Sequence, residues 1–190
     1  MPGGRERLAI LMALRVKGRA EPAAIATAAE VEEEGAARAL ADLAAQGQVR
    51  QVEGTPLAYA LTDAGRATLA RLVAAVPGER ARLGATYEAF LVADAELKAR
   101  ITDWQLDPRL SPVRLAAVHA AGAAGRALVP QFVGAVPALA VYARRLDRAL
   151  VHIAAGDARW VASPAVDALH QVWFELHEEL LVRLGRERPA

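Results

Sequence analysis

The spacing of the apolar residues changes abruptly after Gly47. Up to that glycine, apolar residues recur at intervals of three and four, as they do on one face of a helix. Over residues 48–61 they alternate with polar or small residues instead, on either side of a turn-forming stretch at 53–56. After Thr62 the helical spacing returns. The sequence therefore predicts a mainly α fold with one small β element near its N-terminal end.

The first 78 residues form a predicted domain of their own. We expect helices over 5–17, 22–29 and 33–46, a hairpin over 49–61 and a further helix over 63–76. Gly18 and Gly47 stand where glycine commonly ends a helix, and Thr62 is a suitable N-cap. Three helices followed by a two-stranded ribbon is the winged helix-turn-helix order, in which the third helix enters the major groove of DNA.

Two residue patterns support this assignment. One is L-x-x-x-G-x-V-R at residues 43–50, and the other is Y-x-L-T-x-x-G-R at residues 59–66. Together they resemble the winged helix-turn-helix domains of MarR- and PadR-type transcriptional regulators, over about residues 5–76. MarR proteins usually begin with an extra dimerisation helix that is not seen here, so the order of a winged helix and then a helical extension is closer to PadR proteins. The resemblance implies a regulator that binds double-stranded DNA.

The third predicted helix and the hairpin carry the candidate DNA-binding residues, which are Glu33, Glu34, Ala37, Arg38, Arg50 and Thr55. Arg38 has the fork of donors that reads guanine. The acidic run 32–34 opposes an approach to phosphates. Its carboxylates equally suit the positive N-terminal end of a helix. A winged helix that binds a protein instead of DNA is therefore the alternative.

Residues 79–190 form the second predicted domain, which we expect to be all helical. The expected helices cover 79–101, from Ser111 toward Val129, from Pro137 to Gly156, and from Ser163 to Gly185. The last one has two apolar stripes, of which the second includes His170, Phe174 and His177. A helix that is apolar on two faces needs two partners. We therefore expect this domain to form a homodimer, to bind a small-molecule effector, or both.

Aromatic and histidine side chains of the second domain are the candidates for a ligand pocket or a subunit interface. They are Trp104, Tyr142, Trp160, His170, Trp173, Phe174 and His177. His170 and His177 are two helical turns apart, roughly 10 Å, which is too far to chelate one metal ion. Arg144, Arg145 and Arg148 either hold an acidic ligand or form a solvated surface. Gly122 and Gly125 favour close helix packing over phosphate binding, because they follow no strand and open no helix.

Composition excludes several kinds of chemistry. The chain has 190 residues, no cysteine and a net charge of +1, so it has no disulfide and no thiol nucleophile, and neither half of it is strongly basic. No catalytic constellation, cofactor motif, secretory signal or membrane-spanning stretch is apparent. We expect a cytoplasmic protein that is not an enzyme, from a bacterium with a GC-rich genome, as the many alanines and arginines indicate. The sequence thus favours a transcriptional regulator over a protein-interaction module.

Overall fold

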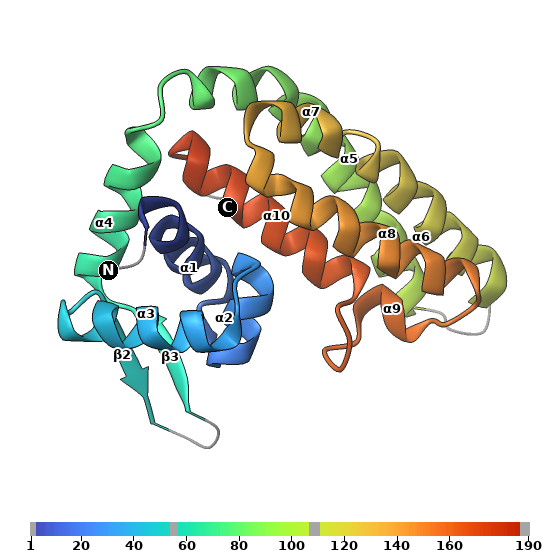
Figure 1. The fold of residues 1–190 in the computed structure, drawn as a ribbon. Helices are drawn as coiled ribbons and strands as arrows, with labels where there is room; N and C mark the ends of the chain where they lie inside the picture. Colours follow the sequence, from blue (N-terminus) through green and yellow to red (C-terminus); the bar gives the residue numbers. More distant parts are fainter. Residues whose placement is uncertain (1–2, 54–56, 107–110, 187–190) are drawn as a thin grey trace. The chain divides into compact units, whose positions relative to one another are not determined.

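The computed structural model describes residues 3–53, 57–106 and 111–186. The chain is mainly helical with a small three-stranded antiparallel sheet (Figure 1). It divides into two compact units, one made of Met1–Pro77 with Leu181–Ala190 and the other of Gly78–Leu180. Residues 181–190 were predicted to belong to the second domain, whereas the described residues 181–186 group with the first unit.

The first unit contains the three helices, the hairpin and the fourth helix in the predicted order. Its elements are α1 (Gly4–Lys17), β1 (Arg19–Ala20), α2 (Pro22–Ala29), α3 (Glu33–Ala45), β2 (Val49–Val52), β3 (Ala58–Leu61) and α4 (Asp63–Ala74). The strand β1 was not predicted, because two residues are too few to show an alternating pattern. It pairs with β3, which gives the sheet the order β1-β3-β2.

Apolar side chains from α1, α2, α3 and α4 form the core of this unit, together with one face of the sheet. Leu11, Ile25 and Leu40 are among the buried helical residues. Val49 and Leu61 are contributed by the sheet and lie opposite each other on β2 and β3. The apolar residues of the predicted helices and of the predicted hairpin thus pack into one core.

The two motifs of the first unit contact each other. The Thr62 hydroxyl donates to the carbonyl of Gly47 at 2.6 Å and accepts from the backbone N–H of Gly65 at 3.1 Å. The Thr62 N–H donates to the carbonyl of Gln48 at 3.0 Å. A Cβ atom on Gly65 would lie 2.0 Å from that same carbonyl oxygen, so only glycine fits there. The predicted N-cap at Thr62 is confirmed, and it also fixes the start of α4 against the end of α3.

The second unit is helical throughout its described residues. Its elements are α5 (Glu79–Leu106), α6 (Ser111–Arg126), α7 (Val129–Ala135), a short 3₁₀ turn (Pro137–Leu139), α8 (Ala140–Ala154), α9 (Arg159–Ala162) and α10 (Leu169–Leu184). The last four residues of α10 are grouped with the first unit. No described helix is both long and apolar enough to cross a membrane.

Two expectations about the ends of helices in this unit were wrong. The last helix begins at Leu169 and not at Ser163, because the Ser163 hydroxyl accepts from the N–H of Ala165 at 3.2 Å and stabilises a local turn. The helix that begins at Ser111 ends at Arg126, and the separate helix α7 follows with Pro130 in its first turn.

The two glycines of α6 allow close packing, as the sequence predicted. A Cβ atom on Gly125 would lie 2.6 Å from the Trp173 ring, and one on Gly122 would lie 2.9 Å from a Leu169 methyl group. Both contacts are closer than real Cβ atoms approach their neighbours. α6 therefore contacts α10 at positions where no side chain fits.

Candidate functional site

The exposed side of α3 carries four of the predicted DNA-binding residues. Glu33, Glu34, Ala37 and Arg38 are all exposed, while Ala36, Ala39, Leu40 and Leu43 are buried on the opposite side. This face is available to a partner of the first unit.

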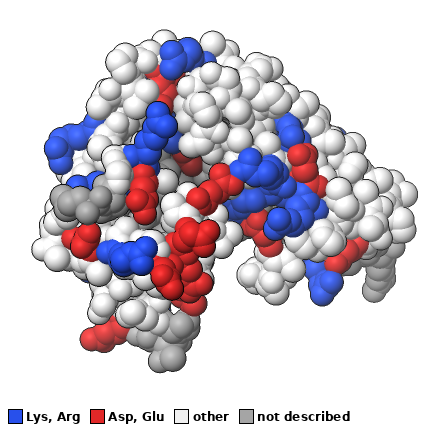
Figure 2. Space-filling model, in the orientation of Figure 1, with Lys and Arg blue, Asp and Glu red and all other residues white. Residues whose placement is uncertain are grey.

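The single basic residue of this face is paired with an acidic one. Arg38 Nη1 lies 3.5 Å from Glu34 Oε2, and both side chains are largely exposed to solvent. Exposed ion pairs of this kind contribute about 1 kcal/mol or less, so Arg38 can exchange Glu34 for another acceptor. Glu32, at the N-cap position, makes no side-chain capping hydrogen bond. On the face that Figure 2 draws, acidic and basic side chains are mixed over α3.

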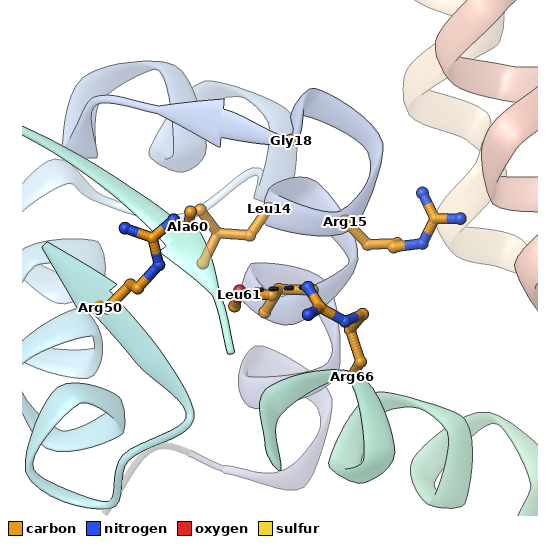
Figure 3. A pocket seen from close by; sticks show the side chains of 7 residues that line it. All are labelled: Leu14, Arg15, Gly18, Arg50, Ala60, Leu61 and Arg66. Atoms are coloured by element: carbon orange, nitrogen blue, oxygen red, sulfur yellow. Dashed lines mark hydrogen bonds between the residues drawn. The ribbon is translucent and has the colours of Figure 1, made fainter. Parts of the chain in front are cut away.

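Arg50, the other basic residue predicted to contact DNA, lines a cavity of about 340 Å³ in the first unit (Figure 3). The cavity is lined by Leu14, Arg15, Gly18, Arg50, Ala60, Leu61 and Arg66, which come from α1 and the turn after it, β2, β3 and α4. Thr55, which was predicted to accompany Arg50, is outside the described residues. Three arginines and no acidic residue are present among these seven.

The sheet register determines where Arg50 lies. Arg50 on β2 and Arg19 on β1 are both paired with Ala60 on the central strand. Residues directly opposite each other share a face of a sheet, so the two arginines flank one small side chain. In Figure 3, Arg50 and Arg66 extend toward β3 from opposite sides, and Arg15 extends away from them.

The three arginines differ in their own contacts. Arg66 donates to the carbonyl of Leu61 at 3.2 Å and forms an ion pair with exposed Asp63. Arg15 also has an interaction of its own. Within the described part of the chain, Arg50 has neither an ion pair nor a hydrogen bond from its side chain. Arg50 is therefore the cation with the most freedom to bind a ligand.

In the second unit, a buried polar cluster joins α5 to α10. Trp173 Nε1 donates to Asp94 Oδ1 at 2.9 Å, and Lys98 Nζ donates to Asp94 Oδ2 at 2.6 Å. His177 Nε2 lies 3.0 Å from the Tyr87 hydroxyl. Its Nδ1 atom is buried without a hydrogen-bond partner, 3.6 Å from Asp94 Oδ2. Trp173 and His177, two predicted pocket residues, are thus brought together in a packed core.

The charge of Asp94 is stabilised by its neighbours. Burial raises the pKa of Asp94, but the interactions with His177, Lys98 and Trp173 outweigh this effect and lower the pKa from 3.8 to about 2. The sequence contained a signal for this residue, because Asp94 occupies the apolar stripe of α5 between Phe90 and Leu97. Asp94 was not among the predicted site residues.

Tyr142, a further predicted pocket residue, belongs to a second polar cluster. Its hydroxyl donates to Glu179 Oε2 at 2.8 Å, and its pKa is raised well above the usual value by burial and by Glu179. On the same helix, Arg145 donates two hydrogen bonds to the carboxylate of Asp167, and its Nη1 atom lies 2.7 Å from Glu175 Oε2. Arg145 therefore joins α8 to residues near and within α10 rather than presenting a free charge.

Basic side chains gather over α8, as Figure 2 shows. Arg144 and Arg148 are exposed there, and Asp147 of the same helix binds Arg126 of α6 through two hydrogen bonds of 2.8 Å. Part of this patch is thus balanced by carboxylates.

The other predicted pocket residues lie in different places. Trp160 stacks on His152 with ring centroids 4.0 Å apart. Trp104 is partly buried on α5, whereas His170 and Phe174 are exposed on α10, Phe174 to 38%. The pKa of His170 is lowered by partial burial and by the charge of Lys98, against the influence of Asp94. The seven residues are therefore divided among several local environments.

Comparisons of the chain with protein-family models, with curated proteins and with solved structures find no match. In the described part of the chain, no group of three histidine, aspartate or glutamate side chains is arranged to hold a metal ion.

Proposed function

We propose that this protein is a DNA-binding transcriptional regulator whose first unit is a winged helix-turn-helix domain. The observation that carries the proposal is the element order of that unit, with α3 exposed on one side and the β2–β3 hairpin following it. The two motifs shared with MarR- and PadR-type regulators support it as well, since their residues form the junction between α3, β2 and α4. In this proposal α3 enters the major groove, with Arg38 reading a base edge.

The second unit has the role of a dimerisation or effector domain in this proposal. Its exposed apolar side chains, such as Phe174 and Val151, suit contact with a second copy of the chain or with a small molecule. A ligand would alter DNA affinity only through its difference in affinity for two states of the protein. No catalytic step is part of the proposal.

The decisive experiment measures binding of the purified protein to fragments of its own upstream region by fluorescence anisotropy. The titrations use a salt series and an excess of nonspecific competitor DNA. We expect sequence-preferring binding that weakens with salt, because each phosphate contact releases counterions. Absence of binding at low salt would contradict the proposal.

Charge variants on α3 sharpen the test. Arg38→Gln should weaken binding about tenfold to a hundredfold if the side chain reads a guanine. Glu33→Gln combined with Glu34→Gln should strengthen it, since two carboxylates leave the face that approaches phosphates. Arg80→Gln is the matched control, because Arg80 is exposed on α5, outside α3 and the hairpin. Equal effects of Arg38→Gln and Arg80→Gln would exclude α3 as the reading helix.

A protein-interaction module is the second candidate function. The observation that favours it is the acidic start of α3, where Glu32, Glu33 and Glu34 are all exposed. Such a surface suits a basic partner better than a nucleic acid. In this case the Glu33 and Glu34 variants would leave DNA binding absent and would weaken binding of the partner.

A further inference from the structure

The charges of the first unit are segregated although they balance in number. Residues 1–80 carry ten basic and ten acidic side chains. Four of the acidic ones, Glu30, Glu32, Glu33 and Glu34, lie at the start of α3 or just before it. The arginines at 15, 19, 50 and 66 lie on or beside the sheet instead. The cavity at the sheet is therefore lined by basic residues without an acidic one, whereas the start of α3 is acidic.

From this arrangement we infer that the cavity at Arg50 and Arg66 is a binding site for a phosphate group. The two guanidinium groups approach the end of β3 from opposite sides, and no acidic residue lines the space between them. Guanidinium forks match the geometry of phosphate oxygens and bind them through paired hydrogen bonds. Arg66 is paired with exposed Asp63, an ion pair that a phosphate can replace, whereas Arg50 has no such partner among the described residues.

Local structure holds the two arginines in place. The backbone position of Arg50 is fixed by its pairing with Ala60, whose small side chain also lines the cavity. Arg66 is on the first turn of α4, and its hydrogen bond to the carbonyl of Leu61 directs its head group toward β3. The junction made by Thr62 and Gly65 fixes that turn. The volume of about 340 Å³ falls in the range of about 300–1,000 Å³ that is usual for small-molecule sites.

A phosphate group at this site has two sources, a small phosphorylated compound or the backbone of DNA. The site does not depend on the proposed function, since a small anion can bind whether or not the protein binds DNA. Inorganic pyrophosphate is a suitable probe because it offers phosphate oxygens without a base or a sugar.

The test is isothermal titration of the full chain with inorganic pyrophosphate at low ionic strength. We expect saturable binding that weakens about tenfold or more in Arg50→Gln, the loss typical of one charge-assisted contact. Arg66→Lys keeps the positive charge but loses the forked guanidinium group, so it should weaken pyrophosphate binding less than Arg66→Gln does. Arg80→Gln removes the same charge from an exposed position outside the cavity and should leave the affinity unchanged. Because Arg66 also contacts Leu61, thermal unfolding by circular dichroism checks that each variant is folded.

A second arm separates the two sources by using a labelled duplex. Displacement of the duplex by pyrophosphate, with both ligands weakened by Arg50→Gln, would assign the site to the DNA backbone. If pyrophosphate binds but leaves the duplex bound, the site is assigned to a small anion. The same assignment follows if pyrophosphate binds and no duplex does, and in that case only the regulator proposal fails. Absence of saturable pyrophosphate binding, or equal binding by the wild type and a folded Arg50→Gln variant, would overturn the inference.

Discussion

Replacing Gly125 by alanine tests how tightly α6 packs against α10. The added methyl carbon would lie 2.6 Å from Cη2 and 2.8 Å from Cζ3 of Trp173. Carbon atoms in contact are normally about 3.5–4.0 Å apart, so the ring or the helix must move by nearly 1 Å. The ring is not free to do so, because Trp173 donates to Asp94 at 2.9 Å and stacks on Phe90 with centroids 4.7 Å apart.

The expected loss of stability follows from two opposing effects. Overpacking a buried site costs about 1–3 kcal/mol, and we take the upper part of that range, about 2–3 kcal/mol, because the added carbon would lie only 2.6 Å from the ring. Alanine inside a helix is about 1 kcal/mol more favourable than glycine, and this gain offsets part of that cost. We therefore expect Gly125→Ala to lower the free energy of unfolding by about 1–2 kcal/mol.

Urea unfolding followed by tryptophan fluorescence measures this loss in the second unit alone, since Trp104, Trp160 and Trp173 all lie in it. Ala124→Gly, at an exposed position of the same helix, is the control that gives the size of the backbone effect. In a Trp173→Phe background the cost of Gly125→Ala should shrink, because the smaller ring makes room for the methyl group. A Gly125→Ala protein as stable as the wild type, or an equal cost in both backgrounds, would refute the packing argument.

Two further substitutions test other parts of the fold. Gly65→Ala should destabilise the first unit by more than about 2 kcal/mol, because its Cβ would meet the backbone carbonyl of Gln48 and not a flexible side chain. Thermal unfolding followed by circular dichroism measures this loss, and an unchanged melting temperature would contradict the prediction. Asp94, whose pKa is lowered to about 2, stabilises the fold at pH values above its unfolded pKa and loses this contribution as the pH falls from about 4 to about 2. The free-energy difference between the wild type and Asp94→Asn should therefore include a contribution of about 2 kcal/mol that disappears over that pH interval. Urea unfolding at several pH values measures it, and a difference that does not vary with pH would show that Asp94 is not held in its charged form.

Features that depend on neighbouring residues were the ones that the sequence predicted well. Gly18, Gly47 and Gly156 follow helices α1, α3 and α8 and have positive φ angles, as expected for glycines at helix ends. The cap at Thr62 joins residues only three positions apart. The hairpin was recognised from its alternating pattern, whereas the two residues of β1 gave no pattern and take their conformation from pairing with β3.

Contacts between distant residues could not be predicted in this way. Trp173 and Asp94 are 79 positions apart, and Tyr87 and His177 are 90 apart. An acidic residue in an apolar stripe indicates a buried partner, but it does not say which residue that partner is. The same limit explains why seven aromatic and histidine residues, grouped by type in the sequence, occupy separate environments in the structure.

The net charge of the first unit likewise did not show which of its charged residues lie together in the fold. Equal numbers of basic and acidic residues in the first 80 positions gave no reason to expect an anion site. The register of three short strands places Arg19 and Arg50 on either side of Ala60, and the cap at Thr62 directs α4 so that Arg66 reaches the same strand. A concave site concentrates the potential of a few cations even when the whole surface is neutral. Affinity for phosphate in this unit should therefore depend on Arg50 and Arg66 individually and change little when distant charges are neutralised.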